Sequence, residues 1–220
     1  MKTAPRSYVA LFCVFLMLNA VYGCLYIPQN TLPKVGDLPP LAKGTEKLLL
    51  TYSFSSKYLY TNTESTKKET TDSDEQTAAK YEYEFTDVFG ESGYFSTMSP
   101  SGDWDIDIEM QYIYEADEFM RLLGLLSLCT LYVLPAYMPE SYHLTAIVTA
   151  QNEEKHAYSI NENGVTTFAW LPLLFVQGKC TEPKKTEVEI RKNMWKTLLF
   201  KMQQDGIIPT QTVTGAKTVK

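Results

Sequence analysis

Residues 104–115 read WDIDIEMQYIYE, and this stretch decides the fold class of the chain. Apolar and aromatic side chains alternate in it with carboxylates and an amide, which is the period of a β-strand buried on one face. The buried face is predicted to carry Trp104, Ile106, Ile108, Met110 and Tyr112. The solvent face is predicted to carry Asp105, Asp107, Glu109 and Gln111. A sheet that contains this strand needs a covering layer on one side only.

Three other stretches have the composition of strands, namely 47–60, 142–150 and 155–161. The last two are separated by the sequence QNEE at 151–154, which is short enough for a hairpin loop. A second turn is predicted at 161–164, where the sequence reads NENG.

Two stretches with helical spacing are predicted to form the layer that covers the buried face of this sheet. Tyr81, Tyr83 and Phe85 alternate as in a strand, but apolar residues three and four apart from Phe85 onward favour a helix over about 83–92 that stops at Gly93 and turns into a strand. A longer amphipathic helix is predicted over 185–204 and is closed by Gly206. Its apolar stripe consists of Ile190, Met194, Trp195, Leu198, Leu199 and Met202.

The fold class that follows is α+β, with a sheet of four to five mostly antiparallel strands and helices packed on one face. The domain is predicted to occupy 47–208, and a polar, low-complexity stretch at 61–80 within it is expected to be a mobile loop. A signal peptide over 1–23 and a Pro-rich, lipid-anchored tether over 24–46 precede the domain, and 209–220 form a flexible tail.

The N-terminal segment has the three parts of a secretory signal. Lys2 and Arg6 form a positive n-region, and residues 9–18 form an apolar run that is short for a membrane span. Val21 and Gly23 are small enough for cleavage by an ordinary signal peptidase. Export predicts that the mature chain resides in the cell envelope.

The sequence Val21-Tyr22-Gly23-Cys24 also resembles the lipobox of bacterial lipoproteins, although a small residue is usual at the position of Tyr22. The resemblance implies that the Cys24 thiol receives a diacylglycerol and that Cys24 becomes the new N-terminus. Several acyl chains would hold the protein on a membrane stably. By resemblance to enteric lipoproteins, Leu25 does not signal inner-membrane retention, so the outer membrane is favoured. Acylation of Cys24 and simple cleavage before it are the two alternatives.

The net charge excludes one class of partner. The formal charge is −6, and loss of Lys2 and Arg6 with the signal leaves 18 basic against 26 acidic residues, or −8. Binding to nucleic acid requires a basic face that displaces counterions, so no nucleic-acid partner is expected. The expected partners are the membrane, through the N-terminal lipid anchor, and a protein of the envelope.

Two uncharged apolar segments need a place in the fold. Residues 122–138 read LLGLLSLCTLYVLPAYM, and residues 168–176 read FAWLPLLFV. Three interpretations are open: a membrane-spanning helix, a buried core helix with its covering segment, and a patch that dips into lipid beside Cys24. The aromatic residues that the third interpretation places at the membrane interface are Tyr132, Tyr137 and Trp170.

No pattern of catalytic or metal-ligating residues is found. His143 and His156 lie in predicted strands on either side of a hairpin, but a metal site needs three or four ligands. The nucleophile elbow, the P-loop, the dinucleotide-binding glycines and the His-Glu-x-x-His motif are absent. We therefore expect no enzyme activity, no catalytic residue, no metal and no cofactor.

Cys129 and Cys180 either pair in an oxidising compartment or are buried thiols.

The order of the predicted elements, including SGYF at 92–95, WLPLL at 170–174 and the helix end MQQDG at 202–206, is similar to that of small uncharacterised bacterial outer-membrane lipoproteins. The resemblance covers about residues 24–208 and implies location and layout, with no catalytic residues. We therefore expect an envelope lipoprotein that faces the periplasm or the cell exterior and has a structural or protein-interaction role, for example as an assembly accessory factor. The alternative is a periplasmic binding module for a small apolar or lipid ligand.

Overall fold

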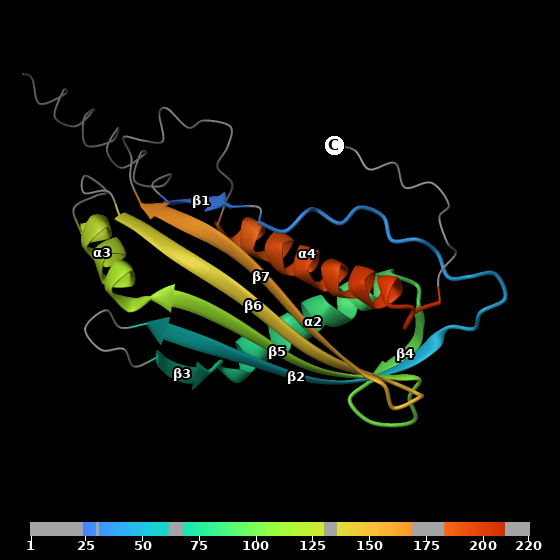
Figure 1. Ribbon diagram of the computed structural model, residues 1–220. Helices are drawn as coiled ribbons and strands as arrows, with labels where there is room; N and C mark the ends of the chain where they lie inside the picture. The colour runs from blue at the N-terminus through green and yellow to red at the C-terminus, as the bar shows by residue number, and fades with distance from the viewer. Residues whose placement is uncertain (1–23, 30, 62–67, 130–135, 169–182, 210–220) are drawn as a thin grey trace, which may run out of the picture.

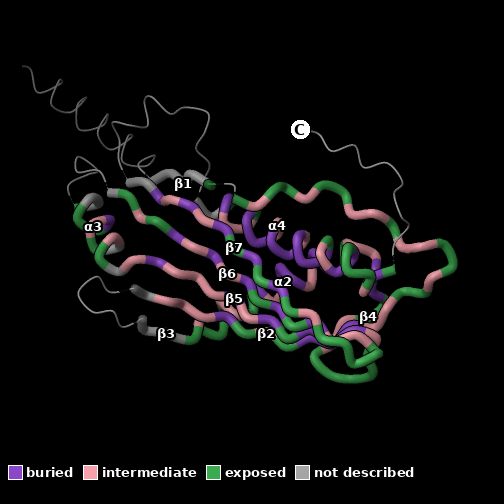
Figure 2. Tube along the Cα trace, in the orientation of Figure 1, coloured by how far each residue is buried: buried purple, intermediate pink, exposed green. Residues whose placement is uncertain are grey.

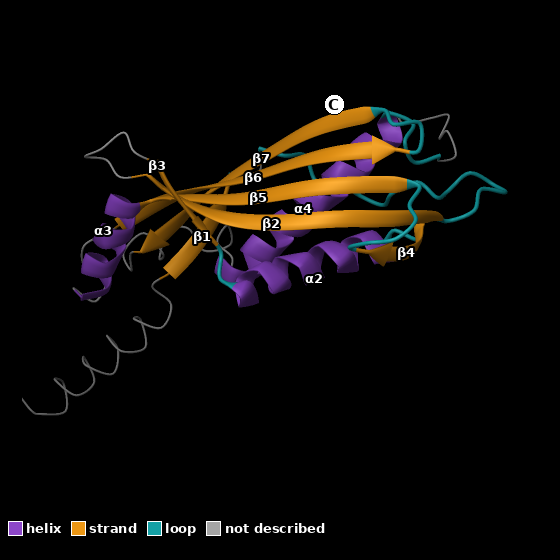
Figure 3. Cartoon of the chain, turned by 90° about the horizontal axis from the view of Figure 1, so that it is seen from below, coloured by secondary structure: helices purple, strands orange, loops and turns teal. Residues whose placement is uncertain are grey.

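The computed structural model describes residues 24–29, 31–61, 68–129, 136–168 and 183–209. An open mixed β-sheet forms one layer, and two long helices cover one of its faces (Figures 1 and 3). The predicted signal peptide lies outside the described residues, as does all but the first residue of the predicted tail.

Seven strands form the described part of the sheet. They are β1 (Cys24–Pro28), β2 (Leu48–Thr61), β3 (Lys68–Asp72), β4 (Phe95–Ser99), β5 (Ile106–Asp117), β6 (Ala136–Ala150) and β7 (Lys155–Phe168). The order across the sheet is β1-β7-β6-β5-β2-β3, and β4 pairs with β2 beside this path. β2 runs parallel to β4 and β5, and the other four pairs are antiparallel.

The described helices are α2 (Glu75–Glu91), α3 (Glu118–Cys129) and α4 (Pro183–Gln204). α2 and α4 lie on the same face of the sheet, whereas α3 lies at one end of it (Figure 3). The predicted α+β class is therefore confirmed. The four long strands and β4 correspond to the four to five that the sequence predicts, and β1 and β3 are added at the two edges.

The strand that decides the fold class has the predicted alternation. Ile106, Ile108, Met110 and Tyr112 are buried, and the residues between them face outward. Trp104 was expected on the buried face, but it lies ahead of β5 and is 36% exposed. The strand begins only at Ile106. The preceding Asp105 is hydrogen-bonded to Leu49 of β2, with its carboxylate accepting from the Leu49 backbone N–H at 2.7 Å and its own backbone N–H donating to the Leu49 carbonyl at 2.9 Å.

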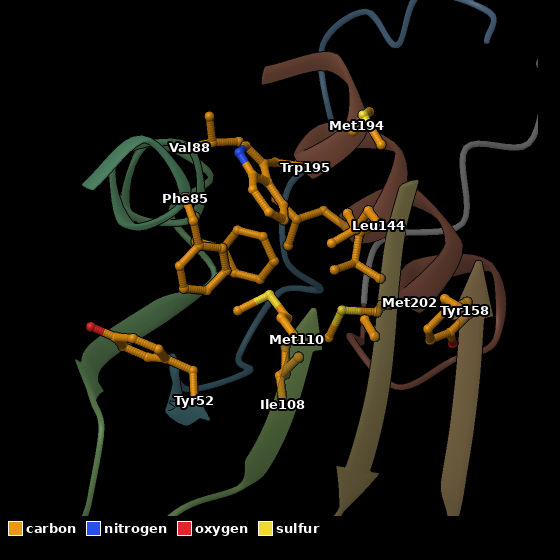
Figure 4. Packing of buried hydrophobic residues seen from close by; sticks show 14 of the residues in the cluster. Tyr52, Phe85, Val88, Ile108, Met110, Leu144, Tyr158, Met194, Trp195 and Met202 are labelled. Carbon is orange, nitrogen blue, oxygen red and sulfur yellow. The ribbon is translucent and has the colours of Figure 1, made fainter. Parts of the chain in front are cut away.

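The core lies between the sheet and the two covering helices, where Figure 2 shows the buried residues concentrated. All six residues of the predicted stripe on α4 are buried. Trp195 lies near the centre of this core (Figure 4), with its ring 5.7 Å from Phe85 of α2 and 6.2 Å from Tyr112 of β5. These contacts join α2, α4 and the sheet in one cluster, so the covering layer is fixed in place.

The predicted mobile loop at 61–80 is wrong from Lys68 onward. Lys68–Asp72 pairs with the outer edge of β2, and α2 already begins at Glu75. The Asp74 carboxylate caps this helix by accepting a hydrogen bond from the backbone N–H of Thr77 at 2.8 Å. Edge pairing and a capped first turn need few apolar residues, which is why a polar composition suggested disorder here.

The hairpin between 142–150 and 155–161 is confirmed, because β6 ends at Ala150 and β7 begins at Lys155. The second turn predicted at 161–164 is wrong. β7 continues through these residues to Phe168, with Gly164 opposite Glu140 in the register of β6 and β7. β6 begins at Ala136, so it supplies pairing partners for the longer β7.

Candidate functional site

The candidate site is the end of the sheet where β5 and β7 finish and where β6 and β1 begin. The antiparallel register places Cys24 beside Phe168, and Phe168 beside Ala136. α3 belongs to the connection between β5 and β6, so it lies at this same end (Figure 1). The predicted lipid-attachment residue and an apolar helix are thereby brought to one end of the molecule, although they are far apart in the sequence.

One side of α3 presents apolar side chains to solvent, and we call it the α3 face. Its members are Phe119, Leu122, Leu125 and Leu126, with exposed fractions of 50%, 55%, 53% and 50%. Together with the exposed Cys129, these positions fall within an arc of about 120° at 100° per residue. Glu118, the first residue of the helix, is the one charged position in the same arc. Scattered exposed leucines are ordinary, but an otherwise apolar arc of this kind indicates an interaction surface.

The composition of α3 explains why this face exists. The helix begins where β5 ends, with the Asp117 carboxylate accepting a hydrogen bond from the backbone N–H of Met120 at 3.1 Å. Its two charged residues, Glu118 and Arg121, both lie in the first turn. A helix that is apolar on several sides needs burial on more than one. The side that carries the buried Gly124 lies against the sheet, and the opposite side stays exposed.

These findings bear on the three interpretations of 122–138. The stretch is not one element, because α3 ends at Cys129 and β6 begins at Ala136. The core interpretation is wrong for α3, since half of each large side chain on the α3 face is exposed. Among the described helices, none combines the length and the hydropathy needed to cross a membrane.

The predicted membrane-contact residues fall partly within the described structure. Tyr137 is 52% exposed near the start of β6, and the register connects it through Thr167 of β7 to Leu25 of β1. Tyr132 and Trp170 lie outside the described residues. Tyr137 therefore joins the end of the sheet that carries Cys24 and α3.

Cys129 is exposed at the last position of α3, and Cys180 lies outside the described residues. Their disulfide stays a prediction. Cys129 is not a buried thiol, so that alternative is wrong for this residue.

The predicted tether over 24–46 is wrong for most of its length. Residues 24–28 form β1, and residues 31–42, which we call the strap, are held against the domain. The Glu162 carboxylate accepts hydrogen bonds from the backbone N–H groups of Thr31 and Leu32, both at 2.9 Å. Burial opposes ionisation of Glu162, but the hydrogen bonds from the strap and from the backbone N–H of Asn163 outweigh it and lower its pKa.

Further contacts hold the rest of the strap. Asn193 of α4 accepts a hydrogen bond from the backbone N–H of Val35 at 3.0 Å and donates one to the carbonyl of Pro33 at 3.3 Å. The Tyr94 hydroxyl donates to the Pro39 carbonyl at 2.5 Å. A Pro-rich segment has few N–H groups and cannot continue a ladder, so side chains of the domain satisfy the groups it does have.

A buried polar cluster lies between the helices and the sheet. Arg191 of α4 donates two hydrogen bonds to the Glu84 carboxylate of α2, from Nε at 2.6 Å and from Nη2 at 2.9 Å. Glu187 lies 3.7 Å from Arg191 Nη1, and burial raises the pKa of its carboxyl group. Glu140 accepts hydrogen bonds from the hydroxyls of Tyr142 at 2.6 Å and Thr166 at 2.7 Å. Each carboxylate has a partner on another residue, so the cluster fixes the packing of the layers.

The two histidines do not form a site together. His143 lies on the solvent face of β6, with Nδ1 2.9 Å from Asn161 Oδ1 and Nε2 3.3 Å from Glu115 Oε2. His156 is opposite Val148 and stacks on Tyr158, which belongs to the core. Within the part of the chain that the structure describes, no group of His, Cys, Asp or Glu is arranged to hold a metal ion.

The fold and this site define a class: an open α+β sheet, covered on one face, with an apolar helix exposed at one end. No protein-family model and no curated protein sequence matches the chain. Among solved structures, it is similar to the crystal structure of protein XCC0632 from Xanthomonas campestris, of family DUF330, at 11% identity and a TM-score of 0.42. That match covers 82% of this chain and 97% of the other. The crystal structure of an uncharacterised protein matches at 6% identity and a TM-score of 0.29, covering 71% and 90% of the two chains.

Sequence reasoning missed the strap and the Glu84–Arg191 pair. The pair left a signal, because each residue stands within an apolar helical stripe where a charge needs a buried partner. Glu84 is three residues after Tyr81, and Arg191 is three residues before Met194. The strap left none, since its partners Glu162 and Asn193 lie more than a hundred residues away.

Proposed function

We propose that this chain is a lipoprotein of the bacterial cell envelope, attached to the outer membrane through Cys24, with a structural or protein-interaction role and no catalysis. The observation that carries the proposal is the position of Cys24, which begins an edge strand at the end of the sheet that also carries the exposed α3 face. Acyl chains attached to Cys24 would therefore extend from the same end of the molecule as the exposed apolar side chains of the α3 face.

The strap supports a rigid attachment. Because residues 31–42 are held by Glu162, Asn193 and Tyr94, little free chain separates Cys24 from the domain. The domain would therefore stand directly on the membrane. β6 has 15 residues, which span about 50 Å at 3.3 Å per residue. The hairpin at 151–154, at the opposite end of this strand, would then face away from the membrane toward a partner.

The alternative, a module that binds a small apolar ligand, requires a pocket with predominantly apolar walls. A groove of about 550 Å³ lies between the strap and α4. Charged residues line much of it, including Lys34, Lys192 and Lys196. An apolar ligand in this groove would lie beside these three amines, so the groove gives the alternative no specific support.

Labelling of growing cells with radioactive palmitate tests the attachment. Wild-type protein and Cys129→Ser, the matched control at an exposed cysteine, are expected to incorporate label, and Cys24→Ser is expected to incorporate none. Intact mass should show a mature chain that begins at an acylated Cys24. A mature chain that begins at an unmodified Cys24, or that retains residues 1–23, would contradict the proposal.

The interaction role is tested at the end away from the membrane. A photo-crosslinking amino acid at Asn152, in the exposed hairpin, is expected to capture an envelope protein in intact cells. The same amino acid at Ser53, on the exposed face of β2, is the control and is expected to capture little. Absence of any protein adduct at Asn152 would argue against a partner at this end.

A further inference from the structure

We infer that the α3 face inserts into the interfacial region of a lipid bilayer and forms a second membrane contact beside Cys24. The inference rests on the proposed attachment, and it names the surface that orients the attached domain. A single acylated residue fixes where the protein is held, and a second contact fixes which end points away from the membrane.

The chemistry of the α3 face favours lipid. Its described side chains are phenylalanine, three leucines and a cysteine, and none of them carries a charge or a strong hydrogen-bonding group. A helix with one apolar face lies in the plane of the bilayer with that face among the acyl chains near the headgroups. Tyr137 at the same end of the sheet has an apolar ring and a polar hydroxyl, which suits the headgroup level.

The size of the α3 face argues against a second copy of the chain as its occupant. α3 has 12 residues and is about 18 Å long at 1.5 Å per residue. Its half-exposed side chains present on the order of 400 Å², whereas each partner in a standard protein interface buries about 800 Å². A bilayer needs no matching protein surface, so this small area is sufficient once the anchor holds the helix nearby.

The placement of α3 also suits this role. β1 is hydrogen-bonded along β7, and α3 lies against β6 and β7, so Cys24 and the α3 face belong to one rigid end. When the acyl chains are in the membrane, this end is already at its surface. Because the mature chain has a net charge of −8, attraction to anionic lipid is not expected to contribute.

The test uses the full chain with Cys24→Ser, exported and cleaved after Gly23, with removal of residues 1–23 verified by intact mass. This protein is floated with phosphatidylcholine vesicles and with vesicles that also contain phosphatidylglycerol. It is expected to float with both to a similar extent. Adding Leu125→Glu should weaken vesicle partitioning about tenfold or more, because it places a charge in the inserted face. Ile147→Glu is the matched control at a 38% exposed position of the sheet, and it should partition like the parent.

Three results would overturn the inference: no flotation of the Cys24→Ser chain, equal flotation of Leu125→Glu and its parent, or a lipid-free dimer that Leu125→Glu dissociates. The third result would assign the α3 face to contact between copies. Circular dichroism checks folding, and Leu122→Gln replaces Leu125→Glu if the latter does not fold. Palmitate labelling reads out the attachment independently, so a failure of the anchor and a failure of the α3 contact are distinguishable.

Discussion

Arg191→Met is expected to destabilise the domain far more than a charge removal at a neighbouring position of the same helix. The Arg191 guanidinium is 1% exposed and contacts the Glu84 carboxylate, which is 8% exposed, through two hydrogen bonds. It also lies 4.6 Å from the centre of the Tyr81 ring. Methionine keeps much of the packing volume but leaves the buried Glu84 carboxylate with only the exposed Lys80 amine, 3.9 Å away, as its cation.

The magnitude follows from this burial. Removing one partner of a buried ion pair costs about 3–5 kcal/mol. With a urea dependence of about 2 kcal/mol per M for a domain of this size, the midpoint of unfolding should fall by about 2 M. Lys192→Met is the matched control, because Lys192 contacts Asp87 at 2.9 Å but both side chains are at least 30% exposed. Its expected cost is about 1 kcal/mol or less.

The assay is urea unfolding of the Cys24→Ser chain, followed by tryptophan fluorescence. The double variant Glu84→Leu/Arg191→Met should recover most of the loss, because it removes the buried carboxylate along with the cation. The reasoning is refuted if Arg191→Met costs no more than Lys192→Met. It is also refuted if the double variant is as unstable as the single one.

Three further predictions concern the strap, the polar cluster and a helix end. The pKa of Glu162 is lowered in the folded state, so its contribution to stability is present above the unfolded carboxyl pKa of about 4.3 and is lost as the pH falls. Glu162→Gln should therefore reduce the loss of stability between pH 5 and pH 3, measured by acid titration followed by fluorescence. The pKa of Glu187 is raised by burial, so its favourable contribution to stability is present at low pH and is lost as the pH rises. The stability of Glu187→Gln relative to the parent, measured by urea unfolding, should therefore be greater at pH 8 than at pH 4. Gly93 follows the end of α2 at φ +74°, where a side chain is strained, so Gly93→Ala should cost about 1 kcal/mol in thermal unfolding. Gly36→Ala is the control and should be nearly neutral, because the added Cβ would lie in open space.

Features that depend on a local period could be predicted from the sequence. The alternation in β5, the apolar stripe of α4 and the hairpin at 151–154 each depend on residues within a few positions of one another. The end of α2 near Gly93 follows from the same kind of local signal, since glycine adopts a positive φ without strain. These features were sufficient for the α+β class with helices on one face.

Features that depend on distant partners could not be predicted. The strap has a Pro-rich composition that is typical of a tether, and it is held by Glu162 of β7 and Asn193 of α4, which lie more than a hundred residues later in the chain. β3 has no apolar pattern of its own and is ordered by the free edge of β2. In both cases the polar side chains or backbone groups of another segment satisfy the hydrogen bonds, so composition alone indicates disorder.

The sequence by itself determined that the chain has an export signal pattern, a half-buried strand, an amphipathic covering helix and an apolar stretch beginning at residue 122. It left open whether that stretch is core or surface, because periodicity does not say how many sides of a helix have neighbours. The tertiary structure decided that α3 has the sheet on one side only, and that Cys24 lies at the same end. The physical reason is the antiparallel register of β1, β7 and β6, which places Cys24, Phe168 and Ala136 in one row.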